Sequence, residues 1–360
     1  MQTKTASQST APADRSSPLI QVEDLRVHFR TQRGVARVVD GANLTIKRGE
    51  IFGLAGESGC GKTTFVEAIL QIVRFGNRQA TGHVWFTPRD ASTPVDLMTL
   101  SPGELRHYRW EHLSYVPQGS MNSLNPVLRI GDQIADGMTA HGIDRAAART
   151  RIPLLLEKVG LEGRVARLYP HELSGGMKQR AIIATAIAMD PELIIADEPT
   201  TALDVNVQRV ILETLMALRR DLGVAILLVS HDLPVHAQLV DRTAIMYAGQ
   251  VIEVGDVRSV LKNSLHPYTR GLMQSIPAIG GARLRLSGIA GVAPSPIAWP
   301  AGCRFHPRCP HAMPVCEGKP PHLALVAPGE RALPWRAQPV ELDRHVACHL
   351  YAESSARSEA

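Results

Sequence analysis

The chain has 360 residues, 44% of them hydrophobic, and a formal net charge of +5 at pH 7. This length allows two domains, or one large domain with an appendage, around a packed core. No run of 18 or more apolar residues occurs, so the sequence predicts no membrane-spanning helix. The positive charge forms no dense Lys/Arg block, which argues against nucleic acid as a partner.

The first segment, residues 1–17, is polar and rich in Ser, Thr and Ala. It lacks the apolar centre of a signal peptide, so we expect a disordered tail on a cytosolic protein. The five cysteines are too few for a disulfide framework in a chain of this size, and the cytosol disfavours disulfides.

A phosphate-binding loop is predicted after two strands of an antiparallel layer, residues 20–29 and 35–46. The loop follows a buried strand, residues 51–55, and precedes a helix that includes residues 65–70. It fits the pattern G-x-x-x-x-G-K-[ST] and consists of Gly56, Glu57, Ser58, Gly59, Cys60, Gly61, Lys62, Thr63 and Thr64. The glycines let backbone N–H groups face phosphate oxygens, and the helix N-terminus adds partial positive charge. Lys62 should reach the β and γ phosphates of ATP, and the Thr63 hydroxyl should bind Mg²⁺.

A more helical and more polar stretch spans residues 101–175, opened by a capping box at Ser101 and Glu104 and containing residues 145–159. Beyond it the sequence predicts two helices, 178–189 and 207–218, that alternate with two apolar strands, 193–196 and 224–229. Apolar runs without alternation are typical of a parallel sheet covered on both faces, so the fold class is α/β. The second helix is expected to bury one face, made of Val207, Val210, Ile211, Leu215 and Leu218.

Two carboxylates end the strand at residues 193–196. Ligands of α/β sheets bind at the carboxyl ends of the strands, so Asp197 and Glu198 should lie at the phosphate loop. We expect Asp197 to hold Mg²⁺ and Glu198 to orient or deprotonate the attacking water.

The segment Leu173-Ser174-Gly175-Gly176-Met177 resembles the signature sequence of ABC-type ATPases, with Met177 in place of the usual Gln. Other motifs of that family occur in the expected order. Gln118 resembles the Q-loop glutamine, Asp204 the D-loop aspartate, His231 the switch histidine and Phe29 the aromatic residue that stacks on adenine. The resemblance covers about residues 18–262. It implies a P-loop NTPase with a RecA-like core, an antiparallel β layer and a helical subdomain at about residues 101–175.

The resemblance also implies how these residues act. Gln118 would contact Mg²⁺ or the attacking water, and His231 would bond the γ-phosphate and hold Glu198 in line. The signature and Asp204 of one subunit would face the phosphate loop of a second subunit, so that two ATP molecules lie between two chains. The departure at Met177 is expected to reduce polar contact without abolishing activity.

A proline-rich extension follows, since 13 of the 25 prolines lie after His266. The segments 266–273, 302–310 and 346–350 resemble the C-terminal extension of ATPases from peptide-type ABC importers, as does the stretch 122–126. We therefore expect an ABC ATPase domain at residues 18–265 and an extension at residues 266–360.

Four cysteines of the extension are spaced C-x5-C-x6-C-x31-C: Cys303, Cys309, Cys316 and Cys348. Thiols gathered in a segment with little core indicate a metal or cluster site, although the C-x2-C knuckle of structural zinc is absent. The resemblance favours a [4Fe–4S] cluster, because some relatives with this extension are thought to hold one. Zinc, free thiols and an occasional disulfide stay open as alternatives.

The function implied is ATP hydrolysis that drives import of peptides or related small solutes, by the nucleotide-binding subunit of an ABC transporter at the cytoplasmic face of the membrane. Partners implied are a second ATPase subunit, more often a paralogue than an identical chain, two integral permease subunits and, indirectly, a solute-binding protein. A soluble ABC ATPase acting on ribosomes or DNA is one alternative, an exporter ATPase is another, and nickel chelates or oligosaccharides are alternative solutes.

Overall fold

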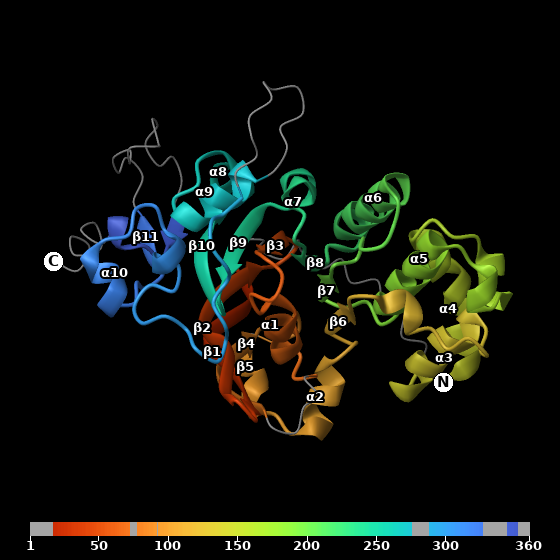
Figure 1. Ribbon diagram of the computed structural model, residues 1–360. Helices are drawn as coiled ribbons and strands as arrows, with labels where there is room; N and C mark the ends of the chain where they lie inside the picture. Colours follow the sequence, from red (N-terminus) through yellow and green to blue (C-terminus); the bar gives the residue numbers. More distant parts are fainter. Residues whose placement is uncertain (1–16, 73–77, 92, 276–287, 327–343, 352–360) are drawn as a thin grey trace.

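The computed structural model describes residues 17–72, 78–91, 93–275, 288–326 and 344–351 (Figure 1). The predicted disordered tail, residues 1–17, lies outside this part except for Ser17. The described residues form two sheets, one of four strands and one of eight. Among them, no helix has the length and apolar character that crossing a bilayer requires.

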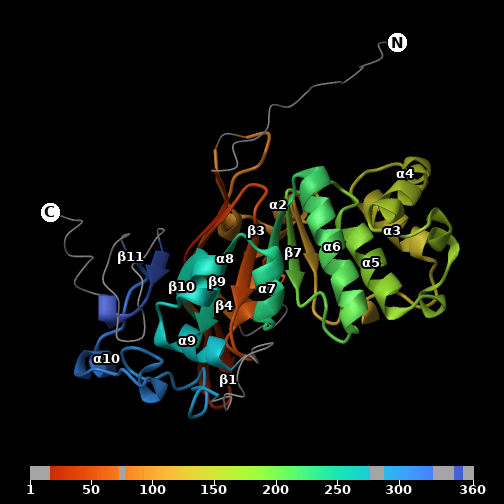
Figure 2. The same ribbon diagram turned by 90° about the horizontal axis from the view of Figure 1, so that it is seen from above.

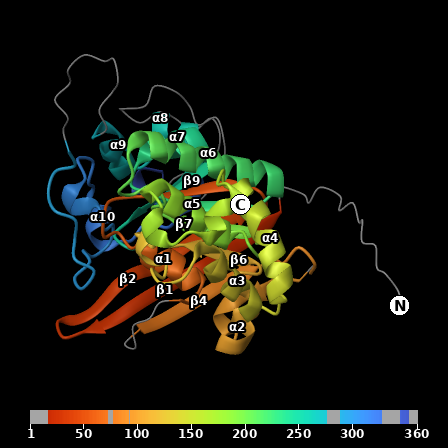
Figure 3. The same ribbon diagram turned by 90° about the vertical axis from the view of Figure 1, so that its right-hand side faces the viewer.

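The four-stranded sheet has the order β2-β1-β4-β5. Its strands are β1 (Pro18–Thr31), β2 (Gly34–Lys47), β4 (Arg78–Phe86) and β5 (Val95–Asp96). All its pairs are antiparallel, which confirms the predicted antiparallel layer. Figure 3 shows β2, β1 and β4 side by side along one side of the molecule.

The eight-stranded sheet has the order β11-β12-β10-β9-β3-β8-β7-β6. Its strands are β3 (Ile51–Ala55), β6 (Leu113–Val116), β7 (Leu193–Asp197), β8 (Ala225–Val229), β9 (Arg242–Tyr247), β10 (Gln250–Asp256), β11 (Ala324–Val326) and β12 (Arg344–Val346). The five strands from β9 to β6 are parallel, as predicted, and β10, β12 and β11 add antiparallel pairs. Strand β6 falls inside the stretch expected to be helical, residues 101–175, but it belongs to this sheet.

The described helices are α1 (Lys62–Ile69), α2 (Pro102–Tyr108), α3 (Ile130–Ala140), α4 (Arg145–Lys158), α5 (Gly175–Ala186), α6 (Val205–Leu222), α7 (Leu233–Leu239), α8 (Val257–Lys262), α9 (Pro267–Gln274) and α10 (Pro314–Gly318). The predicted capping box is present, with Ser101 and Glu104 bonding each other's backbone N–H groups. Figure 2 shows α3, α4 and α5 gathered at one end of the molecule and α10 at the opposite end.

Alternate residues of the central strands point into two different hydrophobic cores. Ile194 and Ala196 belong to the core shared with α3, α4, α5 and α6. Leu193 and Ile195 belong to the core shared with α1 and the four-stranded sheet. The parallel sheet is therefore covered on both faces, which explains why its strands are apolar without alternation.

The predicted buried face of α6 is wrong at one position. Val210 is 41% exposed, whereas Leu212 and Thr214 are buried beside Ile211, Leu215 and Leu218. Apolar residues lie on more than one face of this helix, so the sequence alone allows more than one face to be buried. The packing of α6 against α5 and β8 determines which face is buried.

The described parts of the C-terminal extension pack on the parallel sheet. Strand β12 pairs with β10, and β11 pairs with β12. Phe305 and Tyr268 lie in one core with Ile245 and Tyr247 of β9. The buried Arg344 side chain donates to the buried Glu253 carboxylate, which also accepts N–H bonds from Leu265 and His266. The extension thus completes the sheet of the ATPase body.

Candidate functional site

The phosphate loop joins β3 to α1 and is built around glycines that no other residue could replace without a shift. Gly56 has φ 153°, and a Cβ there would lie 2.2 Å from the carbonyl oxygen of Met246. Gly61 has φ 107°, and a Cβ there would lie 2.5 Å from the carbonyl oxygen of Val38. Ser58 and Gly59 are exposed at the tip of the loop. The backbone curls as an anion cradle requires.

Lys62 starts α1 and is buried within the loop. Its Nζ donates to the carbonyl oxygens of Gly56 at 2.9 Å and Glu57 at 3.0 Å. Cys60 Sγ is 3.8 Å from the same ammonium, and burial raises the pKa of this thiol. The Lys62 ammonium therefore lies inside the phosphate loop and bonds its backbone carbonyl oxygens, at the place where a phosphate would bind. Thr63 and Thr64 follow it, half-buried on the first turn of α1.

Asp197 ends β7 with one carboxylate oxygen unpaired. The residue is fully buried, and the Tyr115 hydroxyl donates to its Oδ2 at 3.4 Å. The Thr63 hydroxyl lies close to this carboxylate, so the loop and the end of the strand lie side by side. Oδ1 has no hydrogen-bond partner. Burial, and next to it the charge of Glu198, raises the pKa of Asp197, although the bond from Thr63 opposes the shift. Buried oxygens without a partner are rare, and a carboxylate beside a hydroxyl is a donor set that Mg²⁺ prefers.

Glu198 lies at the centre of a polar cluster that joins three predicted site residues. Gln118 Nε2 donates to its Oε2 at 3.0 Å, and His231 Nδ1 lies 2.9 Å from its Oε1. The Thr201 hydroxyl also donates to Oε2, at 2.9 Å. Burial favours a higher pKa for Glu198, but the bonds from His231 and Thr201 outweigh it and the pKa is lowered. The backbone of Glu198 has φ 48°, a left-handed conformation that glutamate rarely adopts.

Sequence reasoning missed Tyr115 and Thr201. Tyr115 lies in β6, beside β7, and its hydroxyl reaches Asp197 from the neighbouring strand. Thr201 follows Glu198 by three residues in the turn that leads to α6. The parallel pairing of the two strands is the signal that could have placed Tyr115, because equal positions on neighbouring parallel strands end at the same edge.

The signature segment forms the N-terminus of α5. Ser174 caps this helix, and its hydroxyl accepts the N–H of Met177 at 3.3 Å. Ser174 and Gly175 are exposed, whereas Leu173 is buried and a Cβ on Gly176 would lie 2.5 Å from Val207. Asp204 caps α6 and bonds the N–H groups of Asn206 and Val207. The nearest side chains to the two signature glycines come from Met121, Leu203 and Val207, and not from the phosphate loop.

Phe29 lies in β1, opposite Ala36 of β2 and Arg78 of β4. It is half-buried at the edge of the core under the four-stranded sheet. This position leaves part of the ring accessible, as stacking on a base requires.

The four cysteines of the extension are unpaired, and their thiols lie close enough to influence one another. Burial, with the neighbouring thiols adding to it, raises the pKa of Cys348 to about 12. Over the described ranges, however, no three His, Cys, Asp or Glu side chains are gathered closely enough to hold a metal ion. The prediction of a metal site is therefore not supported by a preformed set of ligands.

Comparison with known proteins gives the family. The family model described as "ABC transporter" matches residues 39–201, which contain the phosphate loop and the signature. The model "Oligopeptide/dipeptide transporter, C-terminal region" matches residues 252–316. The chain belongs to the ATP-binding proteins of oligopeptide/dipeptide-type ABC transporters. It is an ABC-type ATPase.

Relatives of this family match over most of their length. The "Dipeptide transport ATP-binding protein DppD" of Caldanaerobacter subterraneus is 37% identical over 94% of this chain and 98% of its own. The "Oligopeptide transport ATP-binding protein OppD" of Salmonella typhimurium is 39% identical over 91% and 95%.

Solved structures match the ABC cassette fold. The dimeric structure of MJ0796, a bacterial ABC transporter cassette, is 28% identical, covers 66% of this chain and 99% of its own, and has a TM-score of 0.57. A dimeric post-hydrolysis state of that cassette, bound to ADP and Pi, is 26% identical with the same coverage and TM-score.

Proposed function

We propose that this chain powers the import of peptides or related small solutes by binding and hydrolysing MgATP at Gly56–Thr64. The observation that carries the proposal is the Glu198 carboxylate, which Gln118, Thr201 and His231 hold beside the phosphate loop. The names of the relatives, dipeptide and oligopeptide transport ATP-binding proteins, support the choice of solute. We assign the ATPase domain to residues 18–265 and the extension to residues 266–360.

Mg²⁺ would be held by Thr63, Asp197 and Gln118. The unpaired Asp197 Oδ1 and the neighbouring Thr63 hydroxyl fit this ion. When bound, Mg²⁺ neutralises charge on the β and γ phosphates. The Tyr115 hydroxyl bonds the second oxygen of Asp197, Oδ2, which leaves Oδ1 to accept a further partner.

Hydrolysis would proceed by in-line attack of water on the γ-phosphate. Glu198 orients the water and accepts its proton, which its lowered pKa allows because the carboxylate is ionised at neutral pH. His231 holds Glu198 through Oε1 and, being 61% exposed, is accessible to the γ-phosphate. Gln118 bonds Oε2 and would exchange this bond for Mg²⁺ or the water when ATP arrives.

The second half of each ATP site would come from another chain. Leu173, Ser174, Gly175, Gly176 and Met177, with Asp204, would bind the nucleotide held by a partner's loop. Ser174 and Gly175 are exposed at the N-terminus of α5, where backbone N–H groups attract phosphate. The dimeric form of the similar cassette structures supports this arrangement. Phe29 would stack on adenine in the chain's own site.

Coupling to a permease would use a groove beside the Q-loop. A cavity of about 390 Å³ lies between the strands and the helical end, lined by residues that include Tyr115, Pro117, Leu124 and Ile182. Its walls are mainly apolar, which suits a helix of an integral membrane subunit. We propose that the chain works with two integral membrane subunits and with a second ATPase subunit, which in this family is more often a paralogue than an identical chain. A solute-binding protein would act with the complex without contacting this chain. The chain would lie at the cytoplasmic face of the membrane. We propose no nucleic-acid partner.

The extension is proposed to hold a [4Fe–4S] cluster through Cys303, Cys309, Cys316 and Cys348, with zinc as the alternative. Besides burial, the other three thiols raise the pKa of Cys348, which supports the proposal that all four bind one cluster. Protein purified without oxygen should be brown, and a colourless sample with stoichiometric zinc would overturn the assignment.

The transport function is tested by purifying the full chain with an affinity tag from detergent-solubilised membranes. We expect two integral membrane proteins to copurify with it independently of nuclease treatment. Recovery of ribosomal proteins that nuclease abolishes, with no membrane protein, would instead support a soluble ABC ATPase.

A further inference from the structure

The phosphate loop carries an acidic residue in an unfavourable place. Glu57 follows Gly56 directly and lies in the segment that should receive a triphosphate. Its side chain is 28% exposed. A carboxylate there would repel the phosphates of ATP unless a cation compensates its charge.

A cation from the C-terminal extension meets this carboxylate. Arg308 Nη1 donates to Glu57 Oε2 at 3.1 Å, and Nη2 donates to Oε1 at 3.3 Å. The two parallel bonds form the forked pair that arginine makes with carboxylates. The side chain of Arg308 is only 7% exposed, so this charge pair is poorly screened by water.

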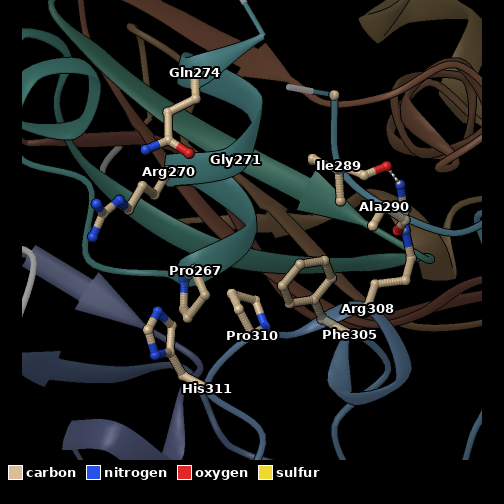
Figure 4. Close-up of a pocket in the computed structure, with 11 residues that line it drawn as sticks. Pro267, Arg270, Gly271, Gln274, Ile289, Ala290, Phe305, Arg308, Pro310 and His311 are labelled. Atoms are coloured by element: carbon tan, nitrogen blue, oxygen red, sulfur yellow. Dashed lines mark hydrogen bonds between the residues drawn. The ribbon is translucent and has the colours of Figure 1, made fainter. Parts of the chain in front are cut away.

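Arg308 has little freedom to leave this position. Its Nε donates to the carbonyl oxygen of Ala290 at 2.9 Å (Figure 4). Its Nη1 lies 3.3 Å from the Tyr247 hydroxyl. A cavity of about 460 Å³ lies between α9 and residues 288–311, and Figure 4 shows Arg308 with Phe305 and Ile289 on its wall. The guanidinium is therefore fixed by other parts of the fold before any nucleotide arrives.

A second residue of the extension fixes the backbone at the same point. The Glu57 N–H donates to the Tyr268 hydroxyl at 3.0 Å. Tyr268 is fully buried and packs on Tyr247, with ring centroids 4.5 Å apart. Lys62 bonds the carbonyl oxygen of Glu57, so both the N–H group and the carbonyl group of this residue are hydrogen-bonded.

We infer that Arg308 is a positioning residue of the ATP site, which compensates the charge of Glu57 and so favours binding of the triphosphate of MgATP in the loop. The C-terminal extension is then part of the nucleotide site, 251 residues along the chain from the carboxylate it pairs with. This inference rests on the proposed binding of ATP at Gly56–Thr64.

The test is a double-mutant cycle on the full-length protein, read as equilibrium binding of MgATP and MgADP. R308Q should raise the Kd for ATP about tenfold and the Kd for ADP less, because repulsion grows with phosphate charge. In the E57Q background the same R308Q change should alter the Kd for ATP less than twofold. A merely structural role of Arg308 would weaken both nucleotides equally in both backgrounds.

R304A is the matched control. Arg304 lies in the same segment, has a side chain 11% exposed and pairs with Asp40, but does not bond the phosphate loop. It should not change the ratio of the two Kd values. R308K keeps the charge, and its ratio should match that of the wild type even if R308Q does not fold.

Three results would overturn the inference: an unchanged Kd for ATP in R308Q, no rescue by E57Q, or an R308K variant that loses ATP selectively. A wild-type protein that binds neither nucleotide would instead remove the proposed ATP site itself, so the two failures are distinguishable.

Discussion

His231 Nδ1 lies 2.9 Å from Glu198 Oε1, although the two residues follow different strands of the parallel sheet. Both β7 and β8 deliver their next residues to the same edge, and the strands pair directly. Glu198, the proposed base, and His231, the proposed γ-phosphate sensor, are therefore hydrogen-bonded to each other. Substitution of either residue should also change the effect of substituting the other.

Glu198→Gln should abolish turnover while nucleotide binding persists. The amide keeps the size of the carboxylate but cannot accept a proton, so kcat should fall at least about 100-fold. Phosphate release gives the rate, and sedimentation with ATP should show an accumulated dimer. The control is Glu213→Gln, which substitutes an exposed residue of α6. Normal turnover in Glu198→Gln would remove this residue from the role of base.

Asp197→Asn should lower the ATPase activity and raise the stability of the fold. Because burial raises the pKa of Asp197, its ionised form costs stability above its unfolded pKa, and the neutral amide should stabilise the nucleotide-free protein at pH 7 by about 1 kcal/mol. The same variant should need about tenfold more Mg²⁺ for hydrolysis. Thermal unfolding without nucleotide and a Mg²⁺ titration of the rate check the two effects. An unchanged Mg²⁺ requirement would contradict the proposed site.

Thr201→Val should move the acid limb of the kcat profile. The Thr201 hydroxyl helps to lower the pKa of Glu198, so its loss raises that pKa and the base is protonated at a higher pH. We expect the acid limb to move to higher pH, with the alkaline side unchanged. Thr214→Val on α6 is a control of the same chemistry, and its acid limb should coincide with that of the wild type.

Much of the site could be predicted from sequence because its parts are local motifs. The loop, Asp197, Glu198, Gln118 and His231 are each placed by a strand end, and parallel strands bring strand ends together. Arg308 and Tyr268 could not be placed, since they lie 251 and 211 residues from Glu57 and belong to no motif that points at it. The short strands β11 and β12, three residues each, show no periodicity that would have predicted their pairing.

Two buried histidines should make the protein sensitive to acid. Burial lowers the pKa of His236 and of His266 to about 3, so the folded protein keeps both neutral. The unfolded chain binds these protons from about pH 6.5 downward. Stability is therefore complete above pH 6.5 and should fall below it, by up to about 1.4 kcal/mol per pH unit for each histidine, until the pH reaches about 3.

Denaturant unfolding at pH 7.5, 6.5 and 5.5 checks this slope. His266 Nδ1 accepts the Tyr268 N–H as the cap of α9, and an asparagine oxygen can do the same without titrating. His266→Asn should therefore halve the histidine contribution to the slope. An identical slope in wild type and variant would mean that His266 is already protonated in the fold.

The pairing of β12 with β10 bears on how this protein can be shortened. A fragment ending near residue 265 contains every ATPase motif, yet it leaves the edge of β10 open and the carboxylate of Glu253 buried without Arg344. An open edge invites pairing with other chains, and a buried unpaired charge is costly. During synthesis, β12 can pair with β10 only after residue 346 has left the ribosome, so this edge of the sheet stays open until then.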